Sequence, residues 1–93
     1  MERAFTYILR CGNGEYYVGS TEDIEKRICQ HKTGKGGHFS RLHLPIELVY
    51  TEEYPTLSQA FKRERQLHGW SRAKKEALIA GNIALLKELS KSK

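Results

Sequence analysis

The apolar positions near the N-terminus fall into two short runs, which together predict a β-hairpin. Residues 4–11 are rich in β-branched and aromatic side chains, and residues 15–20 continue the pattern. Gly12-Asn13-Gly14 between the two runs is a turn sequence. A third strand is predicted for residues 46–53, which follow Pro45 and again carry large apolar side chains.

The length of the hairpin loop decides which side chains share a face of the sheet. A two-residue turn would place Tyr7 and Tyr17 on opposite faces, because a shift of one residue inverts every side chain. A three-residue loop, with its last glycine in a left-handed bulge, pairs Cys11 with Glu15 and places both tyrosines and Gly19 on one face. We predict the three-residue form, since the two tyrosines can act together only in that register.

Helical spacing of apolar residues predicts helices in the rest of the chain. The first helix covers residues 22–33, the second begins at Pro55-Thr56, and the third runs to about Ala80. Residues 34–45 are rich in glycine and basic side chains and are predicted to form a loop. The predicted caps and stops, in chain order, are Thr21 and Gly34, Thr56 and Gly69, Ser71 and Gly81, and Asn82 for a short last helix.

Two of these helices carry charged residues on the face that should pack inward. On the first helix, Arg27 and His31 fall with two isoleucines in one arc of ~100°. On the second, Glu64 lies in the middle of an apolar stripe and must pair with a cation, take up a proton or bind a metal. The stripe contains Leu57, Ala60, Phe61, Leu67 and His68, and the side chains expected to point away are Lys62, Arg63, Arg65 and Gln66.

Together these elements predict an α+β fold, a small three-stranded antiparallel sheet flanked by helices. The chain has 93 residues, so one domain spanning residues 1–93 is expected. No apolar run is long enough to cross a membrane, and the N-terminus does not resemble a signal peptide. Cys11 and Cys29 are not at metal-ligand spacing, which favours free thiols and a cytoplasmic protein. We also expect a monomer.

The net charge of +5 favours polyanionic partners such as nucleic acid, although charge alone does not identify one. The spacing of Tyr7, Tyr17, Arg27 and His31 adds chemistry to that charge. Two phenols and an imidazole can move a proton, and a guanidinium can hold a phosphate, which suits cleavage of a phosphodiester. Each residue alone has a structural alternative, because tyrosines in strands usually pack and a single histidine is more often structural than catalytic.

The order of these residues resembles that of GIY-YIG nuclease domains, in particular the short bacterial proteins of the UPF0213 type. The first triplet is Phe5-Thr6-Tyr7, which keeps only the tyrosine of the family pattern, and the second is Tyr17-Val18-Gly19. Arg27 and His31 follow on the first helix and Glu64 on a later one. The segment from Ser71 to Ile79 also resembles the closing segment of the small members, so the resemblance covers nearly the whole chain.

The resemblance implies hydrolysis of nucleic-acid phosphodiester bonds, with DNA favoured over RNA. Glu64 would anchor a weakly bound Mg²⁺ (or Mn²⁺), and Tyr7 would act as general base toward water. Arg27 would stabilise negative charge, while His31 and Tyr17 pass on a proton or orient the water. The residues expected to position the substrate are Gly19, which would leave room for the phosphate, and Lys32, Lys35, Arg41, Lys74 and Lys75, which would contact the nucleic-acid backbone.

Two alternatives belong to other functional classes. A non-catalytic nucleic-acid-binding module on the same scaffold predicts salt-sensitive binding without metal-dependent cleavage. A protein-interaction domain predicts no salt-dependent binding to nucleic acid at all. The complete set of five candidate residues argues against both, because a module without chemistry has no need for a glutamate on an apolar stripe.

Overall fold

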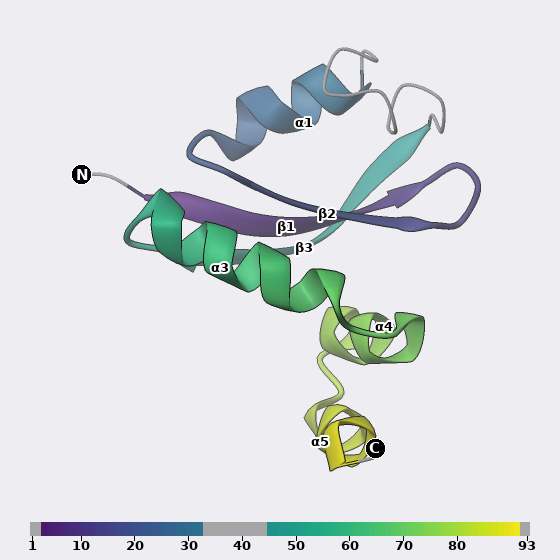
Figure 1. The fold of residues 1–93 in the computed structure, drawn as a ribbon. Helices are drawn as coiled ribbons and strands as arrows, with labels where there is room; N and C mark the ends of the chain where they lie inside the picture. The colour runs from purple at the N-terminus through teal and green to yellow at the C-terminus, as the bar shows by residue number, and fades with distance from the viewer. Residues whose placement is uncertain (1–2, 33–44, 92–93) are drawn as a thin grey trace.

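A three-stranded antiparallel sheet is covered by helices on both faces in the computed structural model, which describes residues 3–32 and 45–91 (Figure 1). The strand order is β2-β1-β3, so β1 is central and β2 is an edge strand. The fold class is therefore as predicted. The elements are β1 (Ala4–Cys11), β2 (Tyr16–Thr21), α1 (Ile24–Lys32), β3 (Ile46–Tyr54), α3 (Leu57–His68), α4 (Arg72–Ala80) and α5 (Ile83–Lys91).

The hairpin loop has the predicted three-residue form. The backbone N–H of Cys11 donates to the Glu15 carbonyl oxygen at 2.9 Å, and the N–H of Gly14 donates to the Cys11 carbonyl at 2.8 Å. Gly14 has a φ of 85°, which a residue with a side chain rarely adopts. This register pairs Tyr7 with Gly19 across β1 and β2.

The alternation of side chains along β1 divides the core into two clusters on opposite faces of the sheet. Tyr7, Leu9 and Cys11 pack on the side of α1, together with Ile46. On the other side, Ile8 lies in a cluster with Val18, Leu67 and Leu78. Figure 1 shows α1 on one face and α3 on the other, with α4 and α5 extending from the α3 side. Side chains of adjacent residues in β1 therefore reach different helices.

The first helix begins later than predicted. Asp23, rather than Thr21, is its N-cap, because the Asp23 carboxylate accepts from the backbone N–H of Lys26 at 3.0 Å. Thr21 instead ends β2, and its hydroxyl accepts from the N–H of Asp23 at 3.1 Å. The predicted Gly-rich loop, which contains Lys35 and Arg41, lies outside the described residues except for Pro45.

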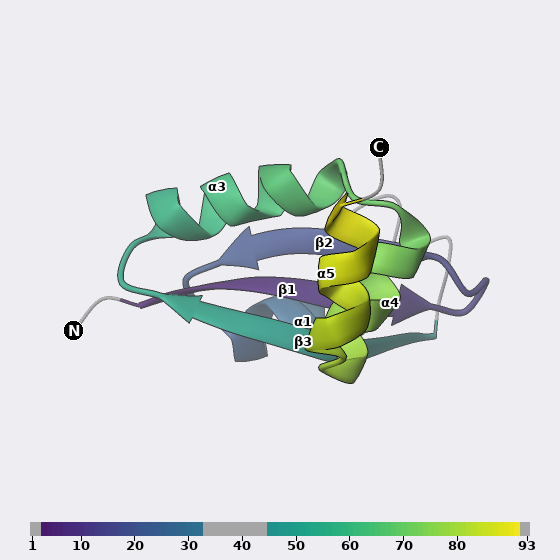
Figure 2. The same cartoon turned by 90° about the horizontal axis from the view of Figure 1, so that it is seen from below.

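The caps predicted for the later helices are confirmed. Thr56 accepts from the N–H of Gln59 and Ser71 from that of Lys74, each at 3.2 Å. Asn82 accepts from the N–H of Leu85 at 3.1 Å. In the view of Figure 2, α3 runs alongside β2, the edge strand. No helix within residues 3–32 and 45–91 combines the length and apolarity that crossing a bilayer requires.

The predicted apolar stripe of α3 is only partly correct. Ala60 and Leu67 are fully buried, but Leu57 and Phe61 are 42% and 50% exposed. A helix beside an edge strand buries a narrow arc, so the outer part of an amphipathic face stays in water.

The prediction that Arg63 points away from the sheet is wrong. Its guanidinium forms two hydrogen bonds with the Glu52 carboxylate of β3, at 2.9 and 3.1 Å. The hydroxyls of Tyr50 and Tyr54 donate to the same carboxylate at 2.5 and 2.7 Å. A carboxylate that accepts four hydrogen bonds holds β3 and α3 together, which a helical wheel of α3 alone cannot anticipate.

Candidate active site

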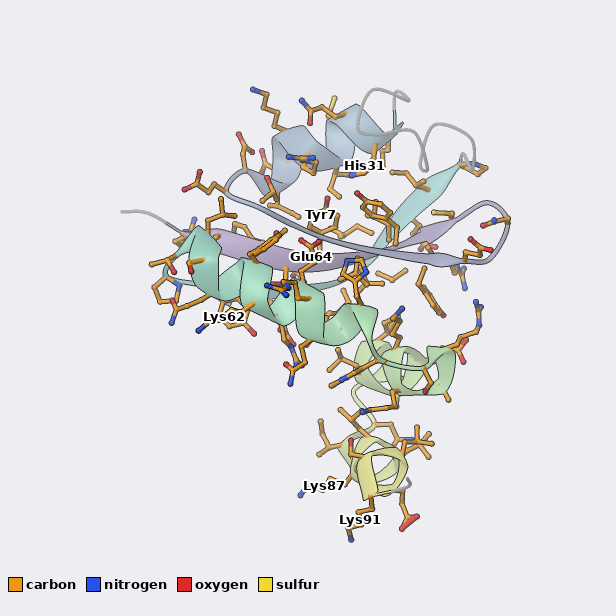
Figure 3. The ribbon with its side chains drawn as sticks, viewed as in Figure 1. Tyr7, His31, Lys62, Glu64, Lys87 and Lys91 are labelled. Atoms are coloured by element: carbon orange, nitrogen blue, oxygen red, sulfur yellow. The ribbon has the colours of Figure 1, made fainter. Side chains whose placement is uncertain are left out.

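Tyr7, Tyr17 and His31 meet between the sheet and α1. The Tyr7 hydroxyl lies 3.1 Å from Nε2 of His31, and both side chains are buried, with 1% and 0% exposure. The centroid of the Tyr17 ring lies 6.5 Å from that of the Tyr7 ring and 5.1 Å from that of the His31 ring. Figure 3 shows Tyr7 on the sheet and His31 on the helix above it. Three of the five predicted catalytic residues therefore form one cluster.

Gly19 has a different role from the predicted one. A Cβ atom at this position would overlap the Tyr7 hydroxyl and lie 2.6 Å from Cζ of the ring. The space above Gly19 is therefore filled by the Tyr7 phenol and is not left for a phosphate. The glycine allows the phenol to lie across the edge strand and reach His31.

The electrostatics of this cluster favour neutral side chains. Burial raises the pKa of Tyr7, the Tyr17 phenol adds to this rise, the Arg27 charge opposes it, and the Glu64 charge adds again. Burial lowers the pKa of His31, and the Arg27 charge lowers it further. A neutral imidazole with its proton on Nδ1 can accept the Tyr7 hydroxyl proton at Nε2. A permanent Tyr7 phenolate, in contrast, is disfavoured.

Arg27 lies one helical turn before His31 and is half-buried. It lines a cavity of about 320 Å³ at the β2 edge of the sheet. Ser20 of β2 and Leu57 of α3 line the same cavity, so the hollow reaches from α1 around the edge strand to α3. Arg27 shares this cavity with a second cation, Lys26, and with the carboxylates of Glu22 and Asp23.

Glu64 approaches the edge strand from the opposite face of the sheet. The Ser20 hydroxyl donates to its Oε1 at 2.6 Å, and Nε2 of His68 lies 3.2 Å from its Oε2. The Glu64 side chain is 19% exposed. Figure 3 shows Glu64 on the side of α3 that faces the sheet, with Tyr7 above it. The edge strand separates Glu64 from the other four candidates, although its charge still affects Tyr7.

The donor set around Glu64 fits a weakly held cation. Among the residues that the structure describes, no group of three or more His, Cys, Asp or Glu side chains could hold a metal ion. Mg²⁺ commonly uses one or two carboxylates and completes its shell with water and substrate phosphates. A single anchored carboxylate at an open edge matches that pattern.

The predicted substrate-positioning lysines do not form one surface. Lys32 ends α1 on one side of the sheet, whereas Lys74 and Lys75 belong to α4 on the other (Figure 1). The Lys74 ammonium lies 4.4 Å from the centre of the Trp70 ring. These residues cannot flank the same phosphate, because the sheet lies between them. Lys35 and Arg41 fall outside the described residues.

Two residues of this edge, Ser20 and His68, were not among the predicted site residues. Ser20 follows the Tyr-Val-Gly triplet directly, and strand alternation places its side chain on the face opposite Tyr17 and Gly19. His68 is one helical turn after Glu64, a spacing that puts the two side chains on one face of α3. The i, i+4 spacing was a usable signal for His68. No pattern in the sequence predicted the contact between Ser20 and α3.

Comparison with known proteins shows the family to which this chain belongs. A model of the GIY-YIG catalytic domain matches residues 3–77. A UPF0213 protein of Staphylococcus saprophyticus is 41% identical over 80 residues, covering 86% of this chain and 98% of that protein. A UPF0213 protein of Natronomonas pharaonis is 40% identical over 76 residues, covering 82% and 89%.

Two solution NMR structures are similar in fold. The UPF0213 protein BH0048 from Bacillus halodurans has a TM-score of 0.55 and 37% identity, with 84% of this chain and 83% of that chain covered. The protein EF2693 from E. faecalis has a TM-score of 0.59 and 30% identity, with 90% and 93% covered. The resemblance inferred from the tyrosine triplets is thus confirmed, and the chain belongs to the GIY-YIG catalytic domain family, among its UPF0213 members.

Proposed function

We propose that this protein is a metal-dependent endonuclease that hydrolyses phosphodiester bonds of nucleic acid, DNA in preference to RNA. The observation that carries this proposal is the buried hydrogen bond between Tyr7 and His31, with Arg27 one turn away. A neutral phenol joined to a neutral imidazole is a path for a proton, and the guanidinium is a binding group for phosphate. Membership of the GIY-YIG catalytic domain family supports the same reaction class.

In the proposed mechanism, Tyr7 relays a proton and is not a phenolate base. The attacking water gives its proton to the Tyr7 oxygen as the phenol gives its own proton to Nε2 of His31. This avoids forming a phenolate at pH 7, which from an ordinary pKa near ~10 would cost about 4 kcal/mol. Tyr7 is 1% exposed, so water reaches its hydroxyl only when a neighbouring side chain such as Tyr17 moves aside.

Arg27 and Glu64 would act on the phosphate from the two sides of the edge strand. Arg27 lines the edge cavity and would stabilise the negative charge that develops on phosphorus. Ser20 holds one oxygen of Glu64 and so fixes the carboxylate at the edge. A divalent cation bound at Glu64 would neutralise phosphate charge and stabilise the leaving oxygen.

Nicking of supercoiled plasmid DNA in the presence of Mg²⁺ tests the proposal, with an RNA substrate run in parallel. We expect Tyr7→Phe and Glu64→Gln each to reduce the rate at least about 10²-fold. Tyr50→Phe is the matched control, because it also removes a hydroxyl from a tyrosine whose pKa burial raises, but in the Glu52 cluster of β3. Equal rates in the wild-type protein, Tyr7→Phe and Glu64→Gln would show a contaminant and refute the assignment.

A non-catalytic nucleic-acid-binding module is the second candidate. The near-complete burial of Tyr7 and His31 favours it, because such a pair is also a stable structural contact. This candidate predicts salt-dependent binding of DNA or RNA with no cleavage under any divalent metal. Binding measured at two salt concentrations alongside the nicking assay separates the two functions.

A further inference from the structure

We propose that His68 is a second protein ligand for the cation at Glu64, so that the two side chains form a chelate selective for Mn²⁺ over Mg²⁺. This inference rests on the proposed function, which places a divalent cation at Glu64. It adds a residue that the family resemblance did not supply and a metal preference that follows from its chemistry.

The distance between the two side chains suits joint coordination. Oε2 of Glu64 and Nε2 of His68 lie 3.2 Å apart. Adjacent ligands of an octahedral ion with bonds of about 2.1 Å lie about 3 Å apart. The two atoms could therefore bind one ion with only a small adjustment of either side chain. The spacing of one turn on a helix is also the one with which paired side chains hold zinc in metalloproteases.

Ser20 orients the Glu64 carboxylate, and both side chains of the pair reach solvent. Ser20 holds Oε1 of Glu64 at 2.6 Å, which leaves Oε2 as the oxygen directed at His68. The His68 side chain is 54% exposed and that of Glu64 is 19% exposed. The remaining positions around an ion would thus be open to water and to a phosphate oxygen.

The structural role of the pair is small, which makes a functional role testable. A single side-chain contact between residues at i and i+4 stabilises a helix only slightly, and the His68 side chain is 54% exposed. Substitution of His68 should therefore leave the fold intact, and any large change in metal binding would come from the lost nitrogen.

The nitrogen ligand determines the expected metal preference. Mg²⁺ and Mn²⁺ both prefer oxygen ligands, but Mn²⁺ is a first-row transition ion and accepts an imidazole nitrogen more readily than Mg²⁺ does. A site made of Glu64 alone would discriminate little between Mg²⁺ and Mn²⁺, since both accept carboxylate oxygen. With His68 included, Mn²⁺ gains a bond that Mg²⁺ gains only weakly.

The test measures the affinity of the full chain for Mn²⁺, with the free ion detected by electron paramagnetic resonance. The affinity for Mg²⁺ is measured by its competition with Mn²⁺. We expect His68→Gln to weaken Mn²⁺ binding at least about tenfold and Mg²⁺ binding less than threefold. Lys62→Gln is the matched control, because it also removes a basic side chain from α3. Figure 3 shows Lys62 on the outer side of the helix, away from Glu64. In wild type, Mn²⁺ should also broaden the ring proton resonances of His68.

The outcomes separate this inference from the function it rests on. Equal Mn²⁺ affinity in wild type and His68→Gln, with loss of binding in Glu64→Gln, would overturn the role of His68 and keep the cation at Glu64. Unchanged binding in both variants would overturn the chelate and the proposed metal site together. A tenfold loss in His68→Gln without any DNA cleavage would support the chelate and count against hydrolysis.

Discussion

Replacing Gly19 with alanine should destabilise the protein and disrupt the tyrosine–histidine pair at once. The added Cβ would overlap the Tyr7 hydroxyl and lie 2.6 Å from Cζ, closer than any ordinary contact. Tyr7 is 1% exposed and its ring contacts His31, so it has no free space into which to rotate. Either the phenol or the edge strand must shift.

The expected cost combines overpacking with a lost hydrogen bond. Inserting a methyl group into a packed core costs about 1–3 kcal/mol. Moving the Tyr7 hydroxyl away from His31 adds about 1 kcal/mol. A total of about 2–4 kcal/mol is a large fraction of the stability of a domain of this size. At roughly 4–8 °C per kcal/mol, the melting temperature should fall by at least about 8 °C.

Urea denaturation followed by circular dichroism measures this effect, with Gly69→Ala as the control. A Cβ on Gly69 would meet nothing closer than the Gln66 carbonyl oxygen at 3.6 Å, an ordinary contact. We therefore expect Gly69→Ala to be neutral or slightly stabilising. In a Tyr7→Leu background, Gly19→Ala should cost at least about 1 kcal/mol less, because the ring that it strikes is absent. A wild-type unfolding midpoint for Gly19→Ala would refute the reasoning.

Arg63→Met should cost about 1–3 kcal/mol in urea denaturation, because the Glu52 carboxylate, 17% exposed, then loses its two bonds to the guanidinium. The same change at Arg65, which is exposed, should have little effect, and equal costs would contradict the role of the pair. Stability should also fall as the pH is lowered from 7.5 to 5.5. Burial lowers the pKa of His31 in the folded protein, so below about 6.5 the unfolded chain binds more protons. His31→Gln should reduce this slope, and an identical slope in both proteins would exclude His31 as its source.

The hairpin and the caps could be predicted because their causes are local. A glycine at the third loop position allows the left-handed conformation, and this determined the register that pairs Tyr7 with Gly19. Ser71 and Asn82 accept backbone hydrogen bonds three residues away, within the reach of a sequence pattern. The one wrong cap prediction was Thr21. It is the last residue of β2, and Asp23 is the N-cap of α1.

The orientations of the α3 side chains were harder to predict, because a helical wheel takes no account of the sheet against which the helix packs. The wheel indicated an inward Phe61 and an outward Arg63, yet Phe61 is half exposed and Arg63 is held by Glu52. The partner of Arg63 comes from β3, 11 residues away, and only packing brings the two together.

The sequence alone determined the position of the hairpin and the inward face of α1, because alternation along a strand and the helical repeat are local rules. The loop sequence allowed two registers, and the structure has the three-residue form, in which Tyr7 and Tyr17 share a face and meet His31. Only the tertiary structure decided that Glu64 reaches the same edge from the opposite face and is held there by Ser20. It also decided that the Tyr7 phenol fills the space above Gly19. These features depend on how α3 packs beside an edge strand, and such packing is set by contacts between residues about 44 positions apart.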